Sequence, residues 1–440
     1  MASLAEQVAD VAISTFTSLP EKCKPRTLAD GRREWTPMSA VVLLAQNGES
    51  QHLTCVALAT GTKCLSTSAL PKCKGLVLHD SHAEVLALRG FNHWLLSEVQ
   101  AMLQVPGYQS SYLEPCQGTT TATDETDCRP PYVPSFKIKD NIAIYFFTTE
   151  APCGDASMEI LMESFPSDAA LPWPVHGETD VQLQGRGHFS LLGYTRRKPA
   201  RADAEPSLSK SCTDKLAVKQ FSSVLSFPAD LFIQKTPSAF IRSVVVYSDQ
   251  YHATGYERAF GRSGRLSKLH SLGHVFNVEP LPVEFPRFAF DKRQQSSGAL
   301  PQTTSKVTNI SALLIRRTRS DRPDIVEVLI NGVKQGYKQW DERSSKASVI
   351  CRKNLWDLAL SVSSLLEARH DAERIASTPH RKIGWLEDLH GTLSSRTYDE
   401  AKSSGLRVLF RDRKKQVTDA MGNWTKNRGD GNWSQSCTRP

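Results

Sequence analysis

Four residues in three short segments have the side chains of a catalytic zinc site. His82 and Glu84 lie in DSHAEVL, Cys153 lies in APCGDAS, and Cys212 lies in SCTDKLA. One histidine and two cysteines supply three zinc ligands and leave the fourth tetrahedral position open to water, which is the catalytic arrangement. A carboxylate beside that position can move protons to and from the water without binding the metal. The sequence therefore predicts His82, Cys153 and Cys212 as metal ligands and Glu84 as the catalytic residue.

Each predicted ligand lies near the start of a predicted helix. Apolar residues recur at helical spacing after His82, and the strand-like segment NIAIYFFTT (141–149) comes directly before the segment that contains Cys153. Cys212 begins a further helix, with serine and threonine at capping positions. Helix N-termini carry a partial positive charge, so this placement favours the thiolate form that a metal needs.

The remaining elements predict an α/β protein. Residues 36–60 read as two strands joined by a turn at Asn47-Gly48, and strands alternate with helices from there on. Two polar stretches, at about 105–138 and 166–206, read as insertions. Cys116 and Cys128 lie in the first insertion, so we expect neither to bind metal.

The C-terminal third predicts helices at 346–375 and 396–421. Three basic segments, 194–201, 261–270 and 316–322, could either track phosphates or form a solvated surface.

Composition predicts a soluble protein with an anionic partner. The 440 residues carry 54 Lys+Arg against 46 Asp+Glu, a net charge of +8, which favours nucleic acid without establishing it. The N-terminus lacks the basic region of a secretory signal, and no stretch approaches the roughly 20 apolar residues of a membrane span. The 10 cysteines therefore read as reduced thiols, and we expect a cytoplasmic and/or nuclear protein.

Four motifs in order resemble those of the eukaryotic adenosine-to-inosine editase family. They are ATGTKC (59–64), HAEVLALRGF (82–91), APCGDAS and SCTDKLA. The H-x-E and P-C pairs are also typical of zinc nucleobase deaminases. The usual second cysteine of that pattern, three residues after the first, would fall at Ala156, so Cys212 has to replace it.

This resemblance implies a fold, a reaction and a substrate. The fold would be a cytidine-deaminase-like mixed sheet flanked by helices and enlarged by C-terminal elaborations. An N-terminal helix (1–20) would precede a deaminase domain (21–430) and a short tail (431–440). The reaction would be hydrolytic deamination of adenosine to inosine, with zinc activating water and Glu84 moving protons.

The segment that leads into SCTDKLA is similar to that of the tRNA-specific, fungal-like branch of the family. Lys198, Pro199, Arg201 and Asp203 match it, and no separate double-stranded RNA binding domain fits in front. The expected substrate is therefore tRNA, at the adenosine immediately 3′ of the anticodon (position 37) of tRNA(Ala), with no obligate protein partner evident. The alternatives are an adenosine deaminase that acts on another RNA, and a non-catalytic RNA-binding protein that contains zinc.

The resemblance further implies a buried inositol hexakisphosphate. The residues expected to contact it are Arg89, Lys215, Arg352, Lys402 and Lys426. Leu88 and Val218 depart from the pattern, because arginines are usual at both positions.

The resemblance also suggests residues that touch the substrate or link the two sites. Thr62 and Lys63 would contact RNA or the polyanion, although Lys63 alone fits a solvated loop equally well. Asp80 and Lys198, together with Lys215, would connect the polyanion to the zinc site.

Overall fold

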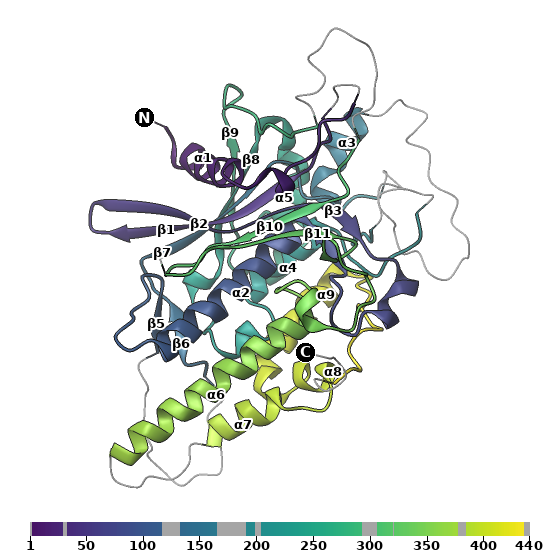
Figure 1. The fold of residues 1–440 in the computed structure, drawn as a ribbon. Coiled ribbons are helices and arrows are strands. Elements are labelled where there is room, and N and C mark those ends of the chain that lie inside the picture. The colour runs from purple at the N-terminus through teal and green to yellow at the C-terminus, as the bar shows by residue number, and fades with distance from the viewer. Residues whose placement is uncertain are drawn as a thin grey trace.

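A mixed β-sheet forms the centre of the molecule (Figure 1). The computed structural model describes residues 2–29, 33–116, 133–164, 191–198, 204–292, 306–319, 321–376 and 384–434. Within these residues the sheet has eight strands in the order β12-β11-β10-β2-β1-β7-β8-β9. Their bounds are β1 (Met38–Asn47), β2 (Ser50–Thr60), β7 (Ile142–Thr148), β8 (Ile241–Tyr247), β9 (Asn277–Leu281), β10 (Ser311–Ile315), β11 (Ile325–Ile330) and β12 (Val333–Lys334). Strands β7, β8 and β9 run parallel to one another, and the other neighbours are antiparallel, so the predicted mixed sheet is confirmed.

The predicted hairpin is confirmed. Strands β1 and β2 pair from Asn47↔Ser50 onward, and Gly48 has the positive φ of 62° that such a turn requires.

Both faces of the sheet are buried, because the side chains of β1 alternate between two cores. Val41 and Leu43 belong to one core, and Val42 and Leu44 belong to the other. Helix α1 (Leu4–Thr17) covers the second face, whereas α2 (Ala83–Gln104) packs on the first face, with α6 (Arg352–Ala376) outside it (Figure 1). A sheet covered on both faces explains the long apolar run of β1.

Short elements surround the sheet. They are β3 (Thr62–Cys64), β4 (Asp80–His82), β5 (Leu113–Pro115), β6 (Phe136–Ile138), α3 (Met158–Ser164), α4 (Cys212–Ser222) and α5 (Ala253–Phe260). The first predicted insertion contains the paired strands β5 and β6, while its residues 117–132, including Cys128, lie outside the described residues. Residues 165–190 and 199–203 of the second insertion, and 435–440 of the tail, also lie outside them.

The C-terminal region has more helices than the sequence suggested. They are α6 (Arg352–Ala376), α7 (Gly384–Leu393), α8 (Tyr398–Lys402) and α9 (Val408–Met421). The single helix expected at 396–421 is wrong: Ser404 caps a short 3-10 turn, Gly405–Arg407, which separates α8 from α9. None of the helices in the described parts of the chain is long and apolar enough to span a membrane.

Candidate metal centre

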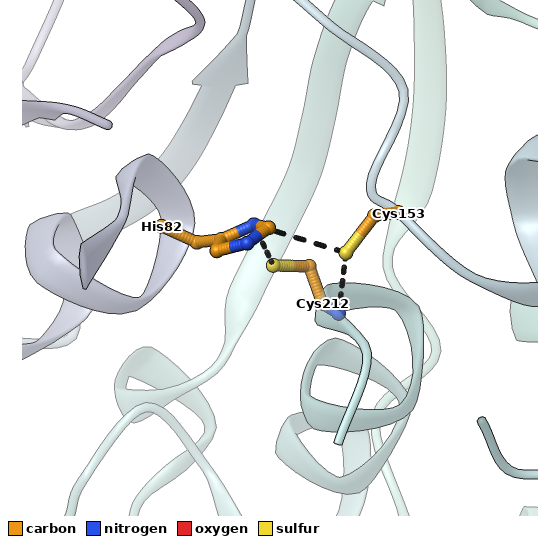
Figure 2. A group of neighbouring side chains, drawn as sticks. All are labelled: His82, Cys153 and Cys212. Atoms are coloured by element: carbon orange, nitrogen blue, oxygen red, sulfur yellow. Dashed lines mark hydrogen bonds between the residues drawn. The ribbon is translucent and has the colours of Figure 1, made fainter. Parts of the chain in front are cut away.

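The three predicted ligands converge on one point. Their side chains face one another in Figure 2, and the sulfur and nitrogen ligand atoms all lie within 4.8 Å of one another. Nδ1 of His82 lies 3.8 Å from the sulfur of Cys153 and 3.6 Å from that of Cys212. In a tetrahedral site with the usual bond lengths, nitrogen and sulfur ligands of zinc stand about 3.6 Å apart. The residues present therefore fit a zinc ion.

Three different elements carry these ligands. His82 is the N-cap of α2, and Cys212 is the first residue of α4, as predicted. Cys153 follows β7 but precedes a 3-10 turn, Asp155–Ser157, so it does not lie at the start of an α-helix as expected.

The two cysteines differ in acidity. The hydrogen bond from Cys212 holds the pKa of Cys153 well below its ordinary value, whereas burial raises that of Cys212. The backbone N–H of Cys212 also donates to the sulfur of Cys153, at 3.3 Å. A metal cation that binds both sulfur atoms would displace the proton that they share, and the proton would pass to solvent.

Glu84 is buried beside these ligands, with 7% of its surface exposed. Burial, and then the charge of Cys153, raise the pKa of Glu84. A raised pKa makes a carboxylate a better proton acceptor, which suits a residue that takes up a proton and returns it.

Asp80 lies behind His82 and is compensated by two lysines. It accepts hydrogen bonds from the backbone N–H of His82 at 3.0 Å and from Nζ of Lys198 at 2.8 Å, and a further one from Lys215. Burial alone would raise the pKa of Asp80, but the charges of Lys198 and Lys215 hold it well below its ordinary value.

Lys198 connects Asp80 to the metal centre. Its Nζ donates to the sulfur of Cys212 at 3.4 Å. Burial alone would lower the pKa of Lys198, but Asp80 and the cysteines raise it well above its ordinary value. A continuous chain of contacts therefore runs from Lys215 through Asp80 and Lys198 to Cys212.

Strand β3 places Thr62 and Lys63 beside the centre. It pairs with β4 so that Thr62 lies opposite His82 and Lys63 opposite Ser81. Lys63 is exposed and Thr62 is partly exposed.

Three of the five predicted polyanion contacts line an open cavity of about 140 Å³. Arg89, Lys215 and Arg352 line it, together with His79 and Asn427, which the sequence did not suggest. Lys402 lies close by, over the ring of Tyr398, which Arg352 also contacts. Lys426 is exposed, and Leu88 and Val218 are buried in the apolar core.

A second group of potential ligands, Cys73, His79 and Asp430, adjoins this cavity. Nε2 of His79 lies 2.6 Å from Asp430, and a guanidinium nitrogen of Arg352 lies 3.4 Å from Nδ1. Arginine can only donate, so Nδ1 is the acceptor and the proton lies on Nε2, facing Asp430. Burial, and then Arg352, lower the pKa of His79 to about 4, which keeps the ring neutral. The group is thus satisfied by its own hydrogen bonds.

Sequence reasoning missed two buried aspartates. Each of the two ligand cysteines is followed two residues later by an aspartate: Asp155 after Cys153, and Asp214 after Cys212. Both aspartates are buried. The repeated Cys-x-Asp pattern was the available signal.

The three basic segments lie in two different parts of the structure. Arg196 and Arg265, from the first and second segments, both donate to Asp214 beside the metal centre. Thr318 of the third segment instead contacts Glu98, on the C-terminal half of α2.

An α/β sheet that brings a histidine, two cysteines and a buried glutamate together defines the nucleobase deaminase class. Residues 57–428 match the adenosine-deaminase (editase) domain, and the chain belongs to this family. The predicted membership and the prediction of a deaminase enzyme are confirmed.

Several relatives cover much of the chain. The tRNA-specific adenosine deaminase 1 of Schizosaccharomyces pombe is 33% identical over 363 residues, which cover 82% of this chain and 86% of that protein. The protein of the same name from Saccharomyces cerevisiae is 33% identical over 230 residues, which cover 51% and 54%. The one from Drosophila melanogaster is 27% identical over 362 residues, which cover 79% of each.

Proposed function

We propose that the protein is a zinc-dependent deaminase that converts adenosine to inosine in tRNA, immediately 3′ of the anticodon (position 37) of tRNA(Ala). The convergence of His82, Cys153 and Cys212 beside the buried Glu84 is the observation that carries the proposal. The substrate class rests on the names of the relatives from S. pombe and S. cerevisiae. Anticodon-loop bases are already largely unpaired, so extruding one of them costs less than in a duplex.

The residues around this centre have separate roles in the proposed reaction. Zinc at this centre would supply a Lewis acid and make water acidic near pH 7. Glu84 takes a proton from the attacking water and gives it to the N6 amino group, and the C6–N6 bond breaks to release ammonia. The second proton of the water ends on N1, so that C6 becomes the carbonyl of inosine. Lys198 holds a positive charge against Cys212 and favours its thiolate form. Thr62 and Lys63 contact the RNA at the edge of the site.

A panel of three RNA or nucleoside substrates tests this function. Purified protein should form inosine at one adenosine of a tRNA(Ala) transcript, mapped by sequencing, and much less in duplex RNA or free adenosine. Efficient conversion of duplex RNA would favour the alternative substrate. No conversion of any of them by zinc-loaded protein would support the non-catalytic alternative.

We further propose that the cavity lined by Arg89, Lys215 and Arg352 holds a polyphosphate, inositol hexakisphosphate being the family-based candidate. Burial, and then Arg352 and Lys414, lower the pKa of Lys402 well below its ordinary value. Arg407 adds further positive charge near Lys402, whereas the side chain of Lys414 is exposed. Crowded interior cations cost several kcal/mol each unless an anion compensates them. Phosphates bound at Lys215 would then act on the metal centre through Asp80 and Lys198.

Denatured pure protein should release an inositol polyphosphate, detectable by anion-exchange chromatography. Protein from a host unable to make that compound should be insoluble or inactive. Fully active, soluble protein from such a host, with no phosphate-rich ligand released, would exclude the polyanion.

A further inference from the structure

The two cysteine ligands come from separate parts of the chain. They are 59 positions apart, and Ala156 stands where a second cysteine of a single turn would be. In a Cys-x-x-Cys turn, local backbone geometry fixes the distance between the sulfur atoms. Here that distance has to be fixed by tertiary contacts.

Each cysteine turn is anchored by the aspartate two residues after it. Asp155 accepts hydrogen bonds from Nε of Arg258 at 3.1 Å and from the backbone N–H of Gly193 at 2.7 Å. Asp214 accepts from Arg265 at 2.7 Å and from the backbone N–H of Arg196 at 2.9 Å. Both aspartates are fully buried, so these are strong, charge-assisted contacts.

The partners of the two aspartates are themselves joined. The backbone N–H of Arg265 donates to the carbonyl of Arg258 at 2.9 Å, across a turn closed by Gly264. A side chain at Gly264 would lie 2.5 Å from the Arg258 carbonyl oxygen, so the turn in this conformation has no room for one. Gly193 and Arg196, the other two donors, belong to one short segment.

A closed ring of contacts therefore joins the two cysteine turns. Its members, in order, are Asp155, Arg258, Arg265, Asp214, Arg196 and Gly193. We propose that Arg258 and Arg265 are positioning residues that, through Asp155 and Asp214, hold Cys153 and Cys212 at the separation a metal ion requires. This inference rests on the proposed metal site and is independent of which RNA the enzyme uses.

Direct contacts also join the turns, but they lie close to the ligands themselves. The backbone N–H and the hydroxyl of Thr213 donate to the carbonyls of Cys153 at 3.0 Å and of Pro152 at 2.8 Å, and the backbone N–H of Cys212 donates to the sulfur of Cys153 at 3.3 Å. The ring adds a second, rigid connection on the far side of both aspartates, and a metal centre held within fractions of an ångström needs both.

Arg258→Lys and Arg265→Lys test the role of the ring. Both keep the positive charge that compensates the buried aspartates, but a lysine cannot reproduce the forked contact that Arg258 makes with Asp155 and Glu159. Arg287→Lys is the matched control, because Arg287 also pairs with two carboxylates, Asp249 and Asp291.

The measurements are the zinc dissociation constant, by competition with a chelator, and the thiolate-to-metal absorption of the Co²⁺-loaded protein. We expect zinc binding to weaken about 10–100-fold in each ring variant and the Co²⁺ absorption to change, with the control like the wild type. Because both arginines act through one ring, the double variant should lose less than the product of the two single losses.

The outcomes separate this inference from the proposed function. Wild-type protein that binds no zinc would overturn both. Wild-type protein that binds one zinc, with folded ring variants that bind it within twofold and give the same Co²⁺ spectrum, would overturn the ring alone. An equal loss of zinc affinity in Arg287→Lys would also overturn the role of the ring, because any arginine paired with two carboxylates would then have the same effect.

Discussion

Two histidines on or beside α2 remain neutral inside the protein. Burial, and then Arg317, lower the pKa of His93 to about 3, and that of His79 is about 4. An unfolded chain protonates its histidines below about pH 6.5. The unfolded state therefore binds more protons than the folded state in this range, and acid favours unfolding.

The free energy of unfolding should accordingly fall as the pH drops from about 6.5 toward 4. Each such histidine contributes about 1.4 kcal/mol per pH unit well below its unfolded pKa. His93→Gln should flatten this dependence and leave the share of His79 in place. Urea denaturation at pH 7 and pH 5 measures the difference, and an unchanged pH slope in the variant would show that His93 is protonated in the folded protein.

At the scale of elements, the loop after β7 and the start of α4 pack with no space between them. Gly154 has a φ of 115°, and a side chain there would lie 2.3 Å from Oγ of Ser211. The two cysteine turns can approach closely enough to share a metal only because this position has no side chain.

Gly154→Ala should therefore separate the turns and sharply reduce both zinc content and thermal stability. Gly107→Ala is the control, since Gly107 has a φ of 75° with nothing near its missing Cβ, and it should cost only about 1–2 kcal/mol of backbone strain. Metal analysis and thermal denaturation of both variants give the comparison. Full zinc content in Gly154→Ala would contradict the close packing.

Local signals in the sequence predicted the elements that hold the ligands. Asn47-Gly48 encodes its own turn, and the apolar spacing after His82 encodes α2. The break between α8 and α9 was missed because the cap at Ser404 interrupts a segment with good helical composition.

Long-range pairs were beyond sequence reasoning. Arg258 lies 103 positions from Asp155, and Asp430 lies 351 positions from His79. No local propensity or spacing relates such residues, so only the folded chain brings them together.

At the scale of the whole molecule, the exposed cations of the second and third basic segments lie at two separate places. Arg262 and Lys268 are exposed in the basic segment that Arg265 anchors beside the metal centre. Arg322 is exposed near the C-terminal half of α2. Glu98, which contacts that third segment, is 16 residues along α2 from His82, roughly 24 Å at 1.5 Å per residue.

Charge reversal at Arg262 and Lys268 should weaken tRNA binding and raise KM, with kcat little changed, because these residues would contact phosphates and not the reacting base. The salt dependence of binding should lose about one unit of slope for each phosphate contact removed. Arg322→Glu is the control and should bind tRNA like the wild type. A larger loss in Arg322→Glu than in the other two variants would place the RNA at the opposite end of α2.

The central claim is that Glu84 moves protons at a metal-activated deaminase centre. The direct test compares inosine formation in a tRNA(Ala) transcript by wild-type protein and Glu84→Gln under single-turnover conditions, with zinc measured in both. We predict one zinc per chain in each, and a rate at least about 100-fold lower in the variant, because glutamine keeps the size of the side chain but cannot carry the proton. Normal inosine formation by Glu84→Gln, or loss of its zinc, would contradict the account.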